Sequence, residues 1–186
     1  MRLTERVHQR LSTLLQAGDI AIDATAGNGH DTLFLAQQTG QQGHVYAFDI
    51  QQQALDHTKQ RILQHTNLAH VHYIHAGHER MHQHIHPSHI GQIKAITFNL
   101  GYLPKADKQL VTTPQTTLQA LQQSAQLLAK GGIISILAYT AHAGGREECD
   151  AIKIWLETCS TAFNIEVHIP ETGRTSPPEQ FFIYKA

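Results

Sequence analysis

Short apolar runs alternate with longer amphipathic segments along this chain, and that alternation restricts the fold more than any other feature. The apolar runs predict strands at residues 19–25, 44–50, 70–75, 93–100, 132–140, 163–169 and 180–186. Helical spacing of apolar residues predicts helices at residues 3–16, 31–38, 51–64, 114–129 and 147–158, the fourth stopped by Gly131 and Gly132. Because single helices join most strands, we expect an α/β fold with a mostly parallel sheet and helices on both faces. The last two strands have only a loop between them, so they should form an antiparallel pair at one edge.

The length of the chain suits one domain with a buried core. We expect a single domain at residues 1–186, made of an N-terminal helix within 1–17 and a core at 18–186. The net charge of −1 excludes a basic nucleic-acid arm, although RNA binding through a local basic patch stays open. The longest apolar run, residues 133–139, is far shorter than the ~20 residues of a membrane span, so we expect no membrane partner.

The N-terminus and the cysteines both indicate a cytoplasmic protein. The first ten residues, MRLTERVHQR, are charged and lack the apolar stretch of a signal peptide. Cys149 and Cys159 should lie on one helix, roughly 15 Å apart, which is too far for a disulfide. We therefore interpret both as reduced thiols.

A glycine-rich turn, AGNGHD, follows the first strand. Ligands of parallel α/β sheets bind at the carboxyl ends of the strands, so this turn is a candidate site. A dinucleotide fingerprint needs a third glycine where this chain has Thr32, and Asp31 would repel a diphosphate. An acidic turn suits a ligand with a cationic amino group, a sulfonium and no phosphate, which describes S-adenosylmethionine. A nicotinamide-dependent oxidoreductase is the disfavoured alternative.

Asp49 ends the second strand, twenty residues after Gly29. A carboxylate at this place can accept hydrogen bonds from both hydroxyls of a ribose, a role shared by nucleotide and S-adenosylmethionine sites. The alternative is that Asp49 only caps the helix that begins near Gln51.

The fourth strand runs into the sequence FNLGYLP, at residues 98–104. This sequence has the shape of the Asn-Pro-Pro-aromatic loop that amino-group methyltransferases place beside the methyl donor. In-line methyl transfer needs an oriented acceptor nitrogen, and the Asn99 amide oxygen could accept its N–H. Tyr102 could stack on the acceptor base. Alternatively, Asn99 caps a turn and Tyr102 is a half-buried anchor.

The segment after the fifth strand, YTAHAGGREE, should lie on the same rim of the sheet. His142 is a candidate proton acceptor there, because an amine loses a proton when it is methylated. Arg146 is a candidate phosphate contact. Either residue could instead be structural.

Eight of the fifteen histidines lie between His70 and His89. Zinc sites need three or four converging ligands, commonly with cysteine or carboxylate help, and no cysteine is near. We therefore expect no functional metal, and only adventitious binding of nickel or zinc. His78 and Glu79 differ from the rest because they follow the third strand, where residues that contact adenine normally sit in S-adenosylmethionine sites.

Together these motifs resemble a family of small bacterial methyltransferases labelled as rRNA methylases. The resemblance rests on DATAGNGHDTLFLA, HVYAFDIQ, His78-Glu79, FNLGYLP with Asp107-Lys108, YTAHAGGREE and Pro177-Pro178, and it covers about residues 18–184. It implies a Rossmann-like class I methyltransferase fold with a seven-stranded sheet and S-adenosylmethionine as methyl donor. Members include the enzymes that methylate 5-aminomethyl-2-thiouridine at the wobble position, so tRNA is the implied partner.

The resemblance also implies site residues. The donor would be held by Ala26, Gly27, Asn28, Gly29, Asp49, Gln51, His78, Glu79 and Asn99. The acceptor would contact Gly101, Leu103, Pro104, Lys108, Tyr139 and Arg146, while Asn99, Tyr102, Asp31 and His142 would take part in the transfer. The chain departs from the family at residues 105–106, where glycines are frequent, and at residues 140–143, where histidine and proline are frequent.

The expected reaction is a direct in-line displacement, because neither cysteine lies in a rim motif where it could add to a pyrimidine ring. His142 and Asp31 are the two candidates to accept the proton of the amine. RNA would bind a local patch, supplied in part across a homodimer and drawn from Arg2, Arg6, Arg10, Lys105, Lys108 and Arg146. The alternatives are methylation of rRNA or of a small-molecule amine, and a non-catalytic nucleotide- or metal-binding module.

Overall fold

The computed structural model describes residues 2–65, 68–101, 112–159, 161–170 and 176–186. Its strands are β1 (Ile20–Asp23), β2 (His44–Asp49), β3 (His70–His75), β4 (Ile93–Leu100), β5 (Leu128–Ala138), β6 (Phe163–His168) and β7 (Glu179–Lys185). Its α-helices are α1 (Leu3–Ser12), α2 (His30–Thr39), α3 (Gln52–Leu63), α4 (Met81–His84), α5 (Pro114–Leu127) and α6 (Gly145–Cys159). Two short 3₁₀ helices, η1 (His78–Arg80) and η2 (Pro87–His89), flank α4.

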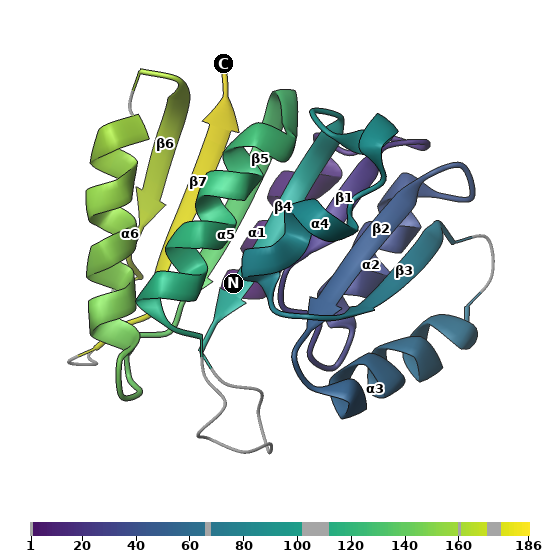
Figure 1. Cartoon of the computed structure of the whole chain (residues 1–186), viewed down its shortest axis with the longest axis horizontal. Coiled ribbons are helices and arrows are strands. Elements are labelled where there is room, and N and C mark those ends of the chain that lie inside the picture. Colours follow the sequence, from purple (N-terminus) through teal and green to yellow (C-terminus); the bar gives the residue numbers. More distant parts are fainter. Residues whose placement is uncertain (1, 66–67, 102–111, 160, 171–175) are drawn as a thin grey trace.

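The strands form one seven-stranded sheet in the order β3-β2-β1-β4-β5-β7-β6. The pairs from β3 to β5 are parallel, whereas β7 runs antiparallel to both β5 and β6, as its reversed arrow in Figure 1 shows. The strand order reverses between β1 and β4, which is where a parallel α/β sheet opens a crevice for a ligand. The predicted mostly parallel sheet with an antiparallel pair at one edge is confirmed.

Helices cover both faces of the sheet. On one face, α1 and α2 bury Leu11 and Leu35 against Val45 and Phe182, and α3 continues this layer through Leu55. On the other face, α4, α5 and α6 pack against alternate strand residues, with Met81, Leu121 and Ile152 in the core; Figure 1 shows α5 and α6 in front of the sheet. Alternate residues of each central strand enter opposite cores, so the central strands β1, β2, β4 and β5 are mostly buried, whereas the edge strands β3 and β6 are largely exposed or half-buried.

The largest error of the sequence analysis lies at the junction of α5 and β5. The helix was expected to run to Ala129 and the strand to begin at Gly132, but α5 ends at Leu127 and β5 begins at Leu128. Leu128 already pairs with Ile93, and an irregularity opposite Ile93–Ala95 absorbs the extra residues, with Gly131 at φ +67°. The glycines therefore form a bulge within the strand rather than the stop of the helix. The short helices η1, α4 and η2 were also missed.

Both cysteines lie on α6 as unpaired thiols, as expected from their spacing. Within the described residues, no helix is long and apolar enough to cross a membrane.

Candidate functional site

Two cavities adjoin at the carboxyl ends of β1, β2 and β4. The first, here called the β2–β3 cavity, has a volume of about 220 Å³ and is lined by the segments that follow these two strands and β4. The second, here called the α1 cavity, has a volume of about 890 Å³ and lies under the start of α1. Thr25, Gly27 and Asn99 line both cavities, so they mark the junction between them.

The glycine-rich turn brings backbone close to both cavities. Gly27 and Gly29 have φ angles of +54° and +76°, which glycine adopts without strain. An added Cβ at Gly29 would lie 2.8 Å from the Cα of Thr58 on α3, so the turn needs glycine for packing as well. Thr58 donates its hydroxyl to the Gly27 carbonyl at 3.2 Å, and this fixes the turn against the helix.

Asp49 links β2 to the glycine-rich turn. Its two carboxylate oxygens accept from the backbone N–H of Gly27 and of Gln51, each at 2.9 Å. Burial raises the pKa of Asp49, and these backbone donors oppose the rise. The capping interpretation is wrong, because the N-cap of α3 is Gln51 and Asp49 bonds to the N–H of that residue instead of to the first turn of the helix. Asp49 lines the β2–β3 cavity, where the sequence analysis placed it.

His78 and Glu79 also line the β2–β3 cavity, together with Gln51. His78 is buried and lies 3.3 Å from the Ala24 carbonyl through Nδ1, which must donate because a carbonyl only accepts. Burial lowers the pKa of His78, so its ring is neutral at pH 7. The β2–β3 cavity therefore has two carboxylates, one neutral histidine and, among its described lining residues, no lysine or arginine.

A chain of three side chains crosses the junction of the cavities. Asn99 donates Nδ2 to one oxygen of Asp31 at 2.6 Å, and His8 on α1 meets the other oxygen at 2.6 Å. The His8 ring stacks flat on Phe34, with ring centroids 3.9 Å apart. Because Asp31 holds the amide nitrogen of Asn99, the amide oxygen is the atom left for a ligand. The site assignments of Asn99 and Asp31 stay predictions, but these two side chains do meet.

The charge of Asp31 is stabilised by its partners. Burial alone would raise the pKa of Asp31, but the hydrogen bonds from His8 and Asn99 outweigh it and bring the pKa below its ordinary value. The carboxylate is therefore ionised at neutral pH and holds protons weakly. The contact of His8 with Asp31 was not predicted from the sequence, because the two residues are 23 positions apart and lie on different helices.

Asp23, at the end of β1, is a second residue that the sequence analysis did not assign. It is fully buried and accepts from the Thr32 hydroxyl at 2.6 Å and from the Thr25 N–H at 3.2 Å. Burial and the nearby charge of Asp31 raise its pKa to about 7. Its position after the first strand was a signal that could have identified it.

We expect Asp23→Asn to change how stability depends on pH. Between about pH 4 and pH 7, folded Asp23 keeps a proton that the unfolded chain releases, so this group's stabilising effect is lost as pH rises. The side chain of the variant does not titrate, so the variant does not lose stability in this way. The free energy of unfolding of the variant minus that of wild type should therefore rise with pH, by at most about 1.4 kcal/mol per pH unit. Urea unfolding of both proteins at pH 5 and pH 8 measures the difference. Parallel pH curves would contradict the raised pKa.

The rim after β5 contributes Tyr139 and His142 to the α1 cavity. His142 Nδ1 lies 2.9 Å from the Ala143 carbonyl and must donate to it, because a carbonyl only accepts. Burial and the charge of Asp31 raise the pKa of Tyr139, which keeps its phenol protonated. Arg146 lines neither cavity among the described lining residues and instead pairs with buried Glu179 at 3.3 Å.

Gly101 and Thr112 bond to each other through two hydrogen bonds. Thr112 donates its N–H to the Gly101 carbonyl at 3.2 Å, and the Gly101 N–H donates to the Thr112 hydroxyl at 3.0 Å. That hydroxyl donates in turn to the buried carboxylate of Glu148 on α6 at 2.8 Å. Glu148 therefore positions Thr112, a role that its sequence position did not reveal. The predicted residues Tyr102, Leu103, Pro104, Lys105 and Lys108 lie outside the described residues.

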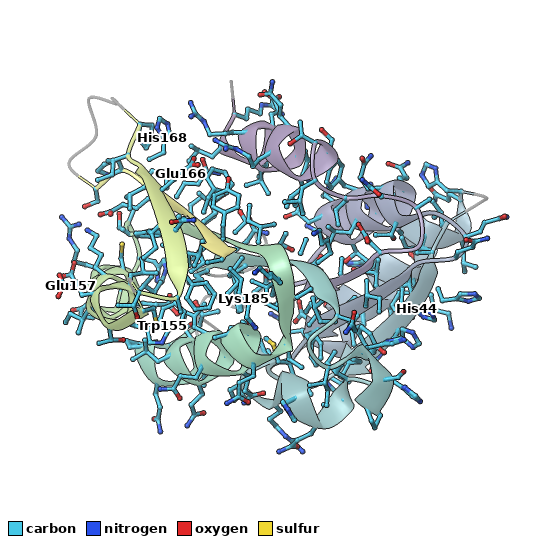
Figure 2. All side chains as sticks on the ribbon, turned by 90° about the horizontal axis from the view of Figure 1, so that it is seen from above. His44, Trp155, Glu157, Glu166, His168 and Lys185 are labelled. Carbon is cyan, nitrogen blue, oxygen red and sulfur yellow. The ribbon has the colours of Figure 1, made fainter. Side chains whose placement is uncertain are left out.

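Two arginines of the candidate RNA-binding patch, Arg2 and Arg10, lie in different places. Arg2 lines the α1 cavity, so it faces the site. Arg10 points to the opposite end of the sheet, where it pairs with Glu166 of β6 at 2.9 Å and lies 5.3 Å from the ring centre of Phe182. Figure 2 shows Glu166 on the side of β6 next to α1.

Histidines gather at the β3 edge of the sheet. Figure 2 shows one of them, His44, on the side of the molecule far from α6. His44 and His72 approach to 3.1 Å between ring nitrogens, and Tyr46 bonds to His89 at 2.8 Å. Burial, with the neighbouring histidines, lowers the pKa of His44 and His72. Within the described parts of the chain, no three His, Cys, Asp or Glu residues are arranged to hold a metal ion.

Comparison with known sequences gives two matches that span most of the chain. The family model described as "Putative rRNA methylase" matches residues 45–184. The chloroplastic tRNA (mnm(5)s(2)U34)-methyltransferase of Arabidopsis thaliana is 36% identical over 160 residues, covering 82% of this chain. The match covers 58% of that relative, so this chain spans little more than half of its length.

Two solved structures share the fold over the full chain. One, described as a "putative rRNA-methylase" from Clostridium thermocellum, has 33% identity and a TM-score of 0.93, covering 100% of this chain and 98% of that one. The other, described as a "putative methyltransferase" from Streptococcus mutans in complex with SAH, has 36% identity and a TM-score of 0.87, covering 100% of this chain and 99% of that one.

Proposed function

The chain belongs to the rRNA methylase family, and on that premise we propose that it methylates the aminomethyl nitrogen of 5-aminomethyl-2-thiouridine at the wobble position of tRNA. The methyl donor is S-adenosylmethionine, and the product is 5-methylaminomethyl-2-thiouridine. The observation that carries this proposal is the junction of two cavities at Asn99, whose amide is oriented by Asp31.

The β2–β3 cavity fits S-adenosylmethionine by the chemistry of its lining. Asp49 and Glu79 are carboxylates suited to ribose hydroxyls and to cationic groups, whereas the absence of lysine and arginine among the described lining residues disfavours a phosphate. Phe48 and Ile50 add apolar surface for a base.

S-adenosylmethionine supplies an electrophilic methyl group, which the amine nitrogen attacks in line as the carbon–sulfur bond breaks. Asn99 holds the acceptor: its amide oxygen accepts one N–H and so aims the nitrogen lone pair. A free alkylamine is mostly protonated at pH 7, so the site must also take up a proton. The lowered pKa of Asp31 makes that carboxylate a weak base, which favours His142, in the lining of the α1 cavity, as the group that takes it.

The choice of tRNA as substrate rests on the Arabidopsis relative, whose name specifies mnm(5)s(2)U34. The volume of the α1 cavity supports it, because about 890 Å³ is ample for a nucleotide turned out of a loop.

The test is methyl transfer from labelled S-adenosylmethionine to bulk tRNA purified from cells that lack this gene, followed by nucleoside analysis. We expect 5-methylaminomethyl-2-thiouridine to appear as its aminomethyl precursor disappears. Donor binding without transfer to tRNA would reject the substrate, and rRNA and small amines would be assayed in its place.

A further inference from the structure

A third cavity of about 370 Å³ lies on the outside of the glycine-rich turn. It is lined by Asn28, His30, His57, Gln60, Arg61 and Gln64, and is here called the α3 groove. It shares Asn28 and His30 with the α1 cavity, so the two hollows form one continuous surface. No carboxylate is among its described lining residues.

Arg61 is held in place at the centre of the α3 groove. Its Nε donates to the Asn28 carbonyl at 2.7 Å, and its Nη2 donates to His30 Nε2 at 3.2 Å. These bonds use two of the five N–H donors of a guanidinium, and the side chain is only partly exposed. The charge is thus fixed at one position, which lowers the entropy cost of binding an anion.

Four of the six residues that line the α3 groove form one face of α3. His57, Gln60, Arg61 and Gln64 recur at i, i+3, i+4 and i+7, whereas buried Leu55 and Thr58 lie on the other side of the helix. S-adenosylmethionine carries no phosphate, so donor binding gives no reason for a fixed cation here. RNA does, because each nucleotide brings a phosphate and RNA affinity depends on neutralising it.

We propose that the α3 groove binds a backbone phosphate of the RNA substrate, adjacent to the nucleotide that occupies the α1 cavity. The inference rests on the proposed RNA substrate and adds where its backbone runs. An RNA backbone that leaves the α1 cavity over His30 would reach Arg61 directly, since His30 lines both the α1 cavity and the α3 groove. A guanidinium with unused donors can bind two phosphate oxygens at once.

The test adds negative charge to the α3 groove and leaves Arg61 and the glycine-rich turn intact. Gln60→Glu with Gln64→Glu changes two exposed residues four apart on α3. We expect roughly 10-fold weaker binding of tRNA from gene-deficient cells, a raised KM for that tRNA, and an unchanged kcat and S-adenosylmethionine affinity. The converse change, Gln64→Lys, should tighten binding and steepen the slope of log K against log salt by roughly 0.7–0.9.

The matched control is Gln122→Glu with Gln126→Glu on α5. These residues are also exposed and four apart, but α5 covers the opposite face of the sheet. The control should bind tRNA like wild type. If wild type methylates tRNA and both double variants behave alike, the α3 groove is not a phosphate site, although the proposed function stands. If wild type neither binds nor methylates tRNA, both proposals fall.

Discussion

Alanine at Asn99 should lower kcat by about 10²- to 10³-fold while the dissociation constant of S-adenosylmethionine stays within about threefold of wild type. The reason lies in the geometry of the junction. The amide nitrogen of Asn99 is bound to Asp31, and we propose that its amide oxygen holds the acceptor nitrogen at the junction of the two cavities. We expect donor binding to depend mainly on Asp49, Gly27 and the segment after β3, which line the β2–β3 cavity. Losing the amide should therefore disturb the orientation of the acceptor nitrogen, and leave the affinity for the methyl donor nearly unchanged.

Two measurements separate these effects. Single-turnover methyl transfer gives the chemical step, and calorimetric titration gives donor affinity. An equal loss in both would show that Asn99 is a donor ligand only. Asp31→Ala provides the partner experiment: if Asp31 acts by orienting Asn99, it lowers kcat as well, and the double variant loses no more than Asn99→Ala alone. Additive losses would contradict the orienting role.

The sheet could be predicted from sequence because its signal is local. The apolar run 44–50, which forms β2, has the length and composition of a buried parallel strand. Candidate site residues could be predicted for the same reason, because parallel strands bring their carboxyl ends to one rim. Asn99 and Asp49 needed only their positions at strand ends to be found.

The rest of the site depends on contacts between distant segments. The partner of His8 is on α2, and the carboxylate of Glu148 reaches Thr112 from α6, so neither role is encoded in neighbouring residues. Arg61 is similar: its spacing indicates only a helix face, and its bond to the Asn28 carbonyl comes from packing. The same limit explains the misplaced start of β5. Pairing of Leu128 with Ile93 outweighed the helix-stop signal of the glycines.

Alanine at Gly29 should lower the stability of the protein more than alanine at Gly18, Gly91 or Gly144. These three glycines also have positive φ, but an added Cβ there would meet no atom within 4 Å. Two costs add at Gly29. A φ of +76° costs an L-residue about 1–2 kcal/mol, and the new Cβ would lie 2.8 Å from the Cα of Thr58, which is backbone and cannot turn away. The total should be about 2–5 kcal/mol, or a fall in Tm of roughly 5–15 °C.

Gly18→Ala is the matched control. Gly18 also has a positive φ, +93°, but an added Cβ would meet no atom within 4 Å. It should therefore show the backbone strain alone, with a fall in Tm of roughly 2–6 °C, and normal S-adenosylmethionine affinity. Gly29→Ala should also weaken donor binding, because moving the turn away from α3 strains the bond between the Gly27 N–H and Asp49. Thermal unfolding with and without S-adenosylmethionine measures both effects, since a bound ligand raises Tm according to its affinity. Equal losses in the two variants would mean that the turn moves freely, and that close packing against Thr58 does not hold the site together.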